Sequence, residues 1–225
     1  MDIDVLRQAP LFSGLDDEAT TALRNSLAEI KLRRGDVLFH EGDSGDRLYV
    51  VLDGKVKLGR SSADGRENLL AIMGPGQMFG ELSLFDPGPR SATVTAVTDA
   101  TFASLSHEDL LRWLDGRPQV ARGLLSQLAA RLRKSNDVVA DLVFSDVPGR
   151  VAKALLDLAD RFGRGADDGI HVHHDLTQEE LAQLVGASRE TVNKALADFA
   201  SRGWVRLEPR SVVIMDIERL GRRAR

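Results

Sequence analysis

Cysteine is absent from this chain of 225 residues. Its absence excludes disulfides, thiolate zinc sites, cysteine-ligated iron–sulfur clusters and catalytic cysteines. Long apolar runs are missing too, and Met1-Asp2-Ile3-Asp4 lacks the basic and apolar regions of a secretion signal. We therefore expect a protein that stays in the cytoplasm and has no contact with a membrane.

An excess of positive charge is also lacking, since the net charge is −4. The acidity lies in residues 1–145, which hold 17 Lys and Arg against 21 Asp and Glu, whereas residues 146–225 hold 13 of each. This balance argues against a protein that binds nucleic acid by bulk charge alone. A neutral domain with a basic end can still present one basic face, so DNA binding by the second part stays open.

Residues from about 32 to 105 have the pattern of short strands separated by turn glycines. The expected strands are rich in β-branched and apolar residues and lie at 37–39, 47–51, 55–58, 68–72 and 92–97. Strands at this short spacing predict a compact antiparallel barrel or roll. A helix is predicted before it, at residues 15–30, because that segment has an acid-rich first turn.

The segment from Phe79 to Ala92 carries one acid, one arginine and one hydroxyl among turn residues. Arg90 can donate two hydrogen bonds to phosphate oxygens, Ser91 adds a neutral donor, and the Gly80-Glu81-Leu82 turn can aim backbone N–H groups at the same anion. Glu81 would be repelled by a phosphate and should accept from a sugar hydroxyl. The segment indicates a site for a ligand with an anion and a hydroxyl; a β-turn with a surface Arg–Glu pair is the alternative.

After Pro118 the pattern becomes helical. Residues four and three apart form a heptad seam: Ala121, Leu125, Leu128, Leu132, Ser135, Val139 and Leu142. The seam predicts a helix that pairs with another helix, and a helix packed on its own domain is the alternative. Ser135, with Asn136 beside it, is polar in an apolar seam, so it either fixes the register or contacts a polar group between the helices. Pro148-Gly149 then indicates a hinge to a second domain.

The second domain begins with a predicted helix at residues 150–162 and a predicted loop at 163–169. Three histidines follow, at His171, His173 and His174. They could ligate a metal, but the alternation of apolar and polar residues at 170–173 favours a strand. No nearby acid or cysteine beyond Asp175 completes a ligand set, so we expect no metal.

A helix-turn-helix follows. Thr177 and Glu180 have the spacing of a capping box, Gly186 supplies the turn, and Ser188 can cap the second helix. On that second helix the apolar face carries Val192, Ala195, Leu196 and Phe199, and the opposite face carries Arg189, Glu190, Asn193 and Lys194. The polar residues are of the types that contact base edges; an ordinary solvated face is the alternative. Residues 203–207 and 211–214 flank the turn Glu208-Pro209-Arg210, which predicts a β-wing.

These motifs together resemble the cyclic-AMP receptor (CRP/FNR) family of bacterial transcription regulators. The resemblance covers nearly the whole chain and is most specific at residues 80–82, 90–92 and 185–192. Residues 147–151 and 174–180 are similar to the actinobacterial Crp/GlxR group of that family.

The resemblance implies an α+β fold with three parts. They are an N-terminal β-roll (a cyclic-nucleotide-binding jelly roll) at residues 1–117, a long dimerisation helix at 118–145 and a C-terminal winged helix-turn-helix at 146–225. It also implies a homodimer that binds palindromic, TGTGA-like operator DNA under the control of cyclic AMP (cAMP), with RNA polymerase as a further partner. A CRP/FNR-type regulator that binds DNA without cAMP, or with a different effector, is the alternative. An enzyme is not expected, because no nucleophile–base pair, P-loop or metal-ligand set is present.

Roles for single residues follow from the same resemblance. Arg90 and Ser91 would hold the cyclic phosphate with help from the backbone of residues 80–82, and the Glu81 carboxylate would take the ribose 2′-hydroxyl. The base would contact five residues: Leu58, Leu70, Met73, Ser135 and, from the partner chain, Asn136. The family has Thr-Ser where this chain has Ser135-Asn136, which leaves the choice between cAMP and cyclic GMP open.

In the second domain, Arg189, Glu190 and Lys194 match the family's base-reading positions. Asn193 and Ser188, on the same helix and at its N-cap, complete the expected DNA-contacting set.

Overall fold

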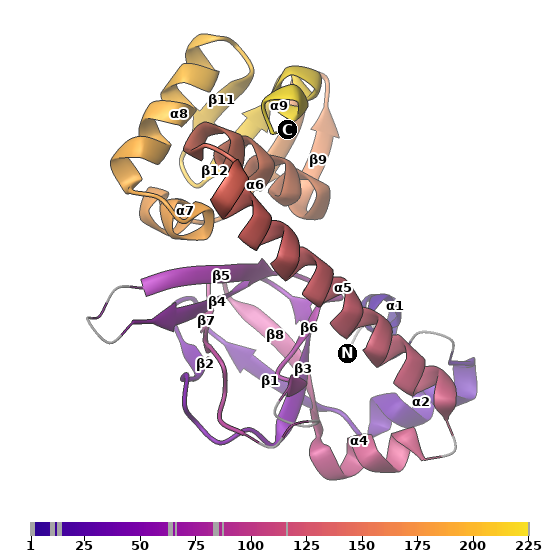
Figure 1. Cartoon of the computed structure of the whole chain (residues 1–225). Helices are drawn as coiled ribbons and strands as arrows, with labels where there is room; N and C mark the ends of the chain where they lie inside the picture. The colour runs from indigo at the N-terminus through magenta and orange to yellow at the C-terminus, as the bar shows by residue number, and fades with distance from the viewer. Residues whose placement is uncertain are drawn as a thin grey trace. The chain divides into compact units, whose positions relative to one another are not determined.

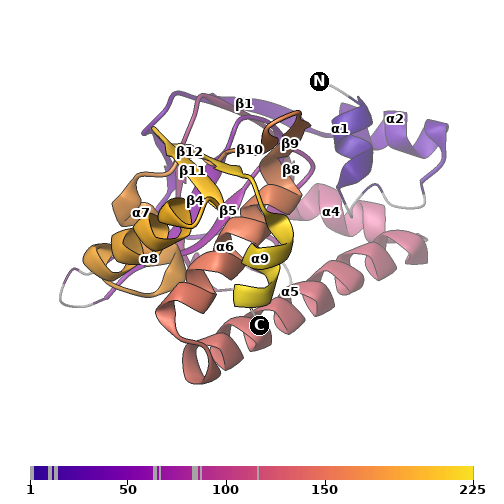
Figure 2. The same ribbon diagram turned by 90° about the horizontal axis from the view of Figure 1, so that it is seen from above.

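The computed structural model describes residues 3–9, 12, 15–62, 65, 67–82, 86, 88–115 and 117–224. Contacts within the chain divide it into two compact units, one of residues 1–60 and 71–134 and the other of residues 61–70 and 135–225. Figure 1 labels the helices and strands, and Figure 2 turns the same ribbon by 90°. Among the described residues, no helix is long and apolar enough to cross a bilayer.

The first unit is built on two antiparallel sheets, with strand orders β1-β8-β3-β6 and β2-β7-β4-β5. The strands are β1 (Ala28–Leu32), β2 (Val37–Phe39), β3 (Arg47–Asp53), β4 (Val56–Ser61), β5 (Glu67–Met73), β6 (Met78–Phe79), β7 (Thr93–Ala96) and β8 (Ala100–Ser106). All five strands expected from the sequence are present. The antiparallel β-roll predicted from the turn spacing is confirmed.

The predicted helix at residues 15–30 is too long by five residues at its C-terminal end. Helix α2 runs only from Asp17 to Asn25, and strand β1 begins at Ala28. The reason is long-range pairing, because Ala28 lies opposite Ser104 of β8 and the whole of β1 follows in register. Such a partner overrides the local helical pattern.

Short helices close one side of the roll. They are α1 (Ile3–Gln8), α2 and α4 (His107–Leu114), and the start of the long helix α5 (Pro118–Phe144) joins them. All contribute to one buried apolar cluster, which includes Leu6, Leu23, Leu110, Val120 and Leu124. Helix α5 therefore packs on its own domain through Val120 and Leu124.

The predicted heptad seam lies on another side of α5. Leu125, Leu132 and Val139 expose 65%, 64% and 61% of their surface. At Leu125, Leu132 and Val139 the seam is thus distinct from the face that contacts the roll, and these three residues do not pack on their own domain. They form an apolar stripe that the described residues leave largely exposed.

The second unit combines helices with one antiparallel sheet of order β11-β12-β10-β9. After the end of α5, its elements are α6 (Val147–Phe162), β9 (Gly163–Ala166), β10 (Gly169–His173), α7 (Gln178–Val185), α8 (Arg189–Ser201), β11 (Val205–Glu208), β12 (Ser211–Ile214) and α9 (Ile217–Arg223). Leu155, Leu181, Leu196, Phe199 and Val212 are buried in its core. The predicted helix-turn-helix and β-wing are both present.

Two local predictions in this unit are wrong. Pro148 and Gly149 do not form a hinge but lie in the first turn of α6, where Asp146 is the N-cap and accepts from the Gly149 N–H at 2.9 Å. Proline is favoured at that position because its missing N–H has no helical partner to lose. The predicted loop at 163–169 is mostly the hairpin of β9 and β10, in which Gly169 lies opposite Ala166.

Candidate functional site

Arg90 is the centre of the first candidate site, and it is 4% exposed. Its backbone is fixed to the preceding loop, because the Arg90 N–H donates to the Asp43 carbonyl and the Gly42 N–H donates to the Arg90 carbonyl. The guanidinium donates through Nη1 to the Gly80 carbonyl at 3.0 Å and through Nη2 to the Arg47 carbonyl at 2.9 Å. Its Nε is buried and has no hydrogen-bond partner among the described residues.

Glu81 lies at the same loop and is 1% exposed. Its Oε1 accepts from Arg131 Nη1 of α5, and Arg131 Nη2 donates to the Met78 carbonyl. A second α5 side chain, Gln127, donates to that carbonyl at 3.2 Å. Glu81 Oε2 is buried with no partner among the described residues. One carboxylate oxygen is therefore engaged and the other is left for an external donor.

Gly80 makes this arrangement possible. Its φ is +83°, a backbone conformation that residues other than glycine rarely adopt. A Cβ at this position would lie 2.9 Å from Arg90 Nη1 and 3.0 Å from the Arg47 carbonyl oxygen. The first atom is part of the guanidinium and the second accepts a hydrogen bond from it, so a larger residue at position 80 would displace Arg90.

The other predicted ligand residues of the roll differ in burial. Ser91 and Leu82 are exposed on the loop, and Leu70 on β5 is 49% exposed. Met73 belongs to the buried cluster inside the roll, and Leu58 packs against that cluster. Residues 83–85 and 87 of the predicted segment lie outside the described residues.

Ser135 and Asn136, predicted to contact the base, are exposed residues of α5. Ser135 follows Arg131 by four positions, so the two share one face of the helix. Sequence reasoning did not identify Arg131, although its place one turn before the polar position of the seam is a signal that could have revealed it.

The roll site suits a ligand that carries both a negative charge and a hydroxyl. A buried donor or acceptor without a partner costs free energy, so the Arg90 Nε and the Glu81 Oε2 each imply a group that completes them. A phosphate oxygen can accept from Nε, and a hydroxyl can donate to Oε2.

The second candidate site is the helix-turn-helix. The capping box of α7 is present: the Glu180 N–H donates to Thr177 Oγ1 at 3.1 Å, and the Thr177 N–H donates to Glu180 Oε2 at 2.8 Å. Gly186 ends α7 with φ +69°, in the left-handed conformation that favours glycine at this position. Ser188 caps α8, since its Oγ accepts from the Thr191 N–H at 3.2 Å. The turn thus fixes where α8 begins.

Helix α8 has the two faces that its sequence predicts. Val192, Ala195, Leu196 and Phe199 are buried on one side. On the other side Arg189, Glu190 and Lys194 are exposed. The Lys194 ammonium pairs with Glu190 Oε1 at 2.8 Å, whereas Arg189 has no hydrogen bond or ion pair with any described residue.

Asn193 lies between these faces. Its Nδ2 donates to Gln178 Oε1 at 3.2 Å, which links α8 to the first turn of α7, and its Oδ1 is buried. This side chain is therefore partly engaged inside the protein, unlike Arg189.

A charged network joins the β9–β10 turn to strands β10 and β11 of the wing sheet. Asp168 accepts from Arg206 Nη2 at 2.7 Å and lies 2.6 Å from His171 Nε2. Hydrogen bonds from Arg206 and then His171 lower the pKa of Asp168 to about 2. His171 is thus engaged in the sheet, and the described residues hold no cluster of three or more potential metal ligands.

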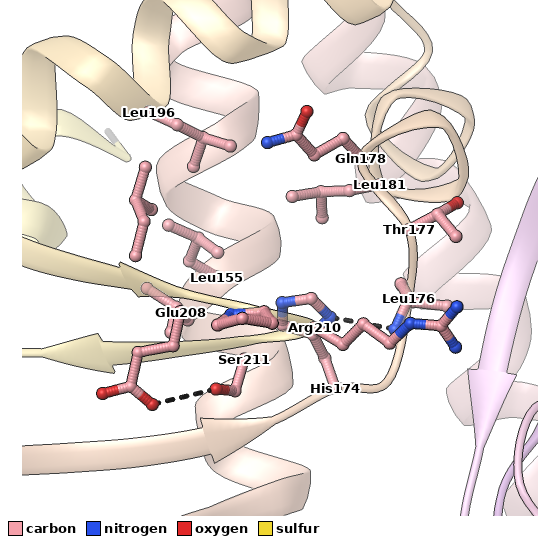
Figure 3. A pocket seen from close by; sticks show the side chains of 13 residues that line it. Leu155, His174, Leu176, Thr177, Gln178, Leu181, Leu196, Glu208, Arg210 and Ser211 are labelled. Carbon is pink, nitrogen blue, oxygen red and sulfur yellow. Dashed lines mark hydrogen bonds between the residues drawn. The ribbon is translucent and has the colours of Figure 1, made fainter.

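A cavity of about 220 Å³ lies between α6, α7, α8 and the wing. Figure 3 shows the side chains that line it, among them Leu155, Leu181 and Leu196. Its polar groups are engaged locally: His174 Nδ1 accepts from the Leu176 N–H at 3.1 Å, and Ser211 Oγ donates to Glu208 at 3.1 Å. The cavity therefore has fewer polar groups available to bind a ligand than the roll site has.

The sequence matches two protein families. Residues 29–117 match the cyclic nucleotide-binding domain, and residues 149–223 match the Crp-like helix-turn-helix domain. The two matches fall on the units that hold the Arg90 site and the recognition helix. They define a transcription regulator that joins a cyclic nucleotide-binding domain to a DNA-binding one.

Relatives match along the whole chain. The chain is 56% identical over 222 residues, 99% of both chains, to the CRP-like cAMP-activated global transcriptional regulator of Mycobacterium tuberculosis. It is 40% identical, over 94% of each chain, to the cyclic AMP receptor protein of Thermus thermophilus. The crystal structure of the Thermus thermophilus catabolite activator protein matches with a TM-score of 0.56 and 38% identity, covering 96% of this chain and 98% of that one. The chain therefore belongs to the cyclic-AMP receptor (CRP/FNR) family of transcription regulators.

Proposed function

We propose that this protein is a homodimeric, cAMP-responsive regulator that binds palindromic TGTGA-like operator DNA. The observation that carries the proposal is the pair of buried, unpartnered atoms at the roll site, Arg90 Nε and Glu81 Oε2. A cyclic nucleotide has an anionic phosphate and a ribose 2′-hydroxyl to offer them. The names of the mycobacterial and Thermus relatives point to cAMP as the nucleotide.

Arg90 and Ser91 would hold the phosphate. The Arg90 side chain is already oriented by the carbonyls of Gly80 and Arg47, so little conformational entropy is lost when an anion arrives. The exposed Ser91 hydroxyl adds a neutral donor beside it. Glu81 Oε2 would accept from the ribose hydroxyl while Arg131 balances the charge of the carboxylate.

We assign the base to Leu58, Leu70 and Met73 from the roll, with Ser135 and the Asn136 of a second copy at the adenine edge. This assignment rests on the family resemblance. Because the chain has Ser-Asn in place of Thr-Ser, a different effector such as cyclic GMP is the second candidate.

The homodimer is supported by the uncovered seam of α5. Leu125, Leu132 and Val139 are spaced by seven residues and are largely exposed in the single chain. A second α5 helix would bury them as a coiled-coil seam. The exposed Val143 and Phe144, at 68% and 86%, extend the apolar surface to the end of the helix.

DNA would be read by α8 in the major groove. Arg189 is free to contact guanine, and Glu190 and Lys194 can exchange their mutual ion pair for contacts with bases or phosphates. In a dimer the two α8 helices would contact half-sites about 34 Å apart on one DNA face. RNA polymerase is the further partner we propose, and operator binding places the protein in the cytoplasm.

The coupling between the sites would be a population shift. A nucleotide favours the DNA-binding arrangement only if it contacts that arrangement better than the other. Helix α5 is the element we expect to carry the shift, because it supplies Arg131 to Glu81 and also bears the seam and Ser135.

The test is binding of a labelled TGTGA palindrome to the purified protein, with and without cAMP, at fixed salt. We expect cAMP to tighten operator binding and calorimetry to detect the nucleotide. Arg90→Ala should lose the response and keep only weak, salt-sensitive DNA binding. If neither calorimetry nor a thermal shift detects cAMP at millimolar concentration, the proposal fails. A response to cyclic GMP alone would favour the second candidate.

A further inference from the structure

The Arg90 guanidinium is a buried cation without a carboxylate partner among the described residues. Glu81, an acid of the same loop, is paired with Arg131 instead. Nη1 and Nη2 of the guanidinium each donate to a neutral carbonyl. Burial of an unpaired charge is costly, so something other than an acid must stabilise this cation in the ligand-free protein.

Two aromatic rings supply that stabilisation. The Arg90 Cζ atom lies 4.3 Å from the centroid of the Phe39 ring and 5.7 Å from that of the Tyr49 ring. The ring faces carry negative partial charge, and they attract a guanidinium strongly when water is excluded. Consistent with this proximity, burial raises the pKa of Tyr49, while the charge of Arg90 and a hydrogen bond from its side chain act in the opposite direction.

The rings come from different sheets of the roll. Phe39 ends β2, which pairs with β7, and Tyr49 lies on β3, opposite Phe79 of β6. The Phe39 and Tyr49 centroids are 5.8 Å apart, and Tyr49 stacks on Phe79 at 5.4 Å. The rings are therefore held by the core and fix the position of the guanidinium.

We propose that Phe39 and Tyr49 are positioning residues for anion binding, which stabilise the buried Arg90 cation and aim it with its Nε free for the ligand phosphate. This inference rests on the proposed function of the roll site and gives it two residues that lie outside the segment from Phe79 to Ala92. A carboxylate in the same place would compete with the phosphate for the guanidinium. A ring face can stabilise a cation without accepting a hydrogen bond from its N–H donors, and the Phe39 ring, which has no acceptor atom, leaves those donors to the ligand.

The experiment compares Phe39→Leu with Phe39→Tyr by calorimetry with cAMP, alongside urea unfolding of each variant. Leucine removes the ring and keeps an apolar side chain, so we expect a loss of cAMP affinity of about 3- to 30-fold, the range of a desolvated cation–π contact. Tyrosine keeps the ring and should retain affinity within about twofold. The control is Phe102→Leu, since Phe102 is fully buried, packs edge-on against Phe79 at 5.9 Å and is not one of the two rings against the Arg90 guanidinium.

The variants separate positioning from packing. A purely structural role would make affinity follow stability, so Phe102→Leu would weaken cAMP binding at least as much as Phe39→Leu. That result, or an unchanged affinity of a folded Phe39→Leu, would overturn the inference. If the wild-type protein itself bound no cAMP, the proposed function would fail first.

A second measurement needs no variant. The chain contains one tyrosine, Tyr49, so a tyrosine-labelled sample gives one set of ring signals in NMR spectra. Addition of cAMP should shift these signals, because an anion would then partly neutralise the cation next to the ring. Binding detected by calorimetry without such a shift would contradict the inference, even if Phe39→Leu did not fold.

Discussion

The carboxylate of Glu81, buried at the loop that precedes Arg90, forms an ion pair with Arg131 of helix α5. The pair joins the candidate ligand site to the helix that carries the exposed seam. Arg131 also donates to the Met78 carbonyl, so one side chain holds both the acid and the backbone that leads to it. The loop and α5 cannot separate without leaving Glu81 buried and unpaired.

Arg131→Met should therefore destabilise the protein by about 1–3 kcal/mol, since it leaves a buried carboxylate without its counter-charge. This expected loss of stability is smaller than that for a fully buried ion pair because the Arg131 side chain is 31% exposed. The double variant Arg131→Met, Glu81→Gln should recover most of the loss, and urea unfolding measures both.

Arg133→Met is the matched control, because Arg133 is an exposed arginine of the same helix. It should unfold within about 0.5 kcal/mol of the wild type. A single variant Arg131→Met as stable as this control would contradict the role we give the ion pair.

Gly80→Ala is expected to remove cAMP binding while the rest of the roll stays folded. The added Cβ would meet Arg90 Nη1 at 2.9 Å and the Arg47 carbonyl oxygen at 3.0 Å, and it would be strained at φ +83°. Calorimetry with cAMP measures the loss, and circular dichroism checks the fold. Gly42→Ala is the control, since Gly42 also has positive φ (+91°) but nothing lies within 4 Å of the added Cβ. Equal cAMP affinity of the two variants would show that the space around Arg90 does not matter.

The sequence predicts local features of this protein better than long-range ones. The strands β2, β3, β4, β5 and β7 follow from glycine turns and β-branched runs that are visible in short windows. Strand β1 was not predicted because it pairs with β8, about 70 residues later in the sequence. The helices α1 and α4 were missed as well, since eight or fewer residues carry too little periodicity to be recognised.

The same limit holds for the candidate sites. Arg90 and Glu81 could be found because both lie in one short segment, and the faces of α8 could be found because a helix repeats every 3.6 residues. Arg131 and Phe39 were not found, because each reaches the roll site from an element about 50 residues away in the sequence. Only the folded chain brings them to the loop.

Asp168→Asn should weaken the second domain at neutral pH and have less effect in acid. Hydrogen bonds from Arg206 and His171 hold the pKa of Asp168 at about 2, below the ordinary value of 3.8. A lowered folded-state pKa means that the stabilisation is complete above about pH 4 and is lost as the pH falls toward 2. The unfolding temperature of the variant should therefore be lower than that of the wild type at pH 7, and the difference should shrink between pH 4 and pH 2.

The neighbour Asp167 provides the control for this pH dependence. It is also exposed in the β9–β10 turn, and no described residue pairs with it. Asp167→Asn should leave the unfolding temperature close to that of the wild type at every pH. A constant difference between Asp168→Asn and the wild type from pH 7 to pH 2 would exclude the ionised carboxylate as its cause.

Arg189→Ala should keep nucleotide binding and lose discrimination at one base pair of the operator. Arg189 is exposed at the start of α8 and has no hydrogen bond or ion pair with any described residue, so its guanidinium is free to contact guanine. Loss of a bidentate contact costs about 1–3 kcal/mol at that base pair. Competition between operator and single-substituted duplexes measures this loss of discrimination.

Arg202→Ala is the control, because Arg202 lies at the other end of α8 and pairs with Asp198 at 2.9 Å; this variant should keep the wild-type preference. Normal discrimination by Arg189→Ala would show that the N-terminal end of α8 does not read the operator.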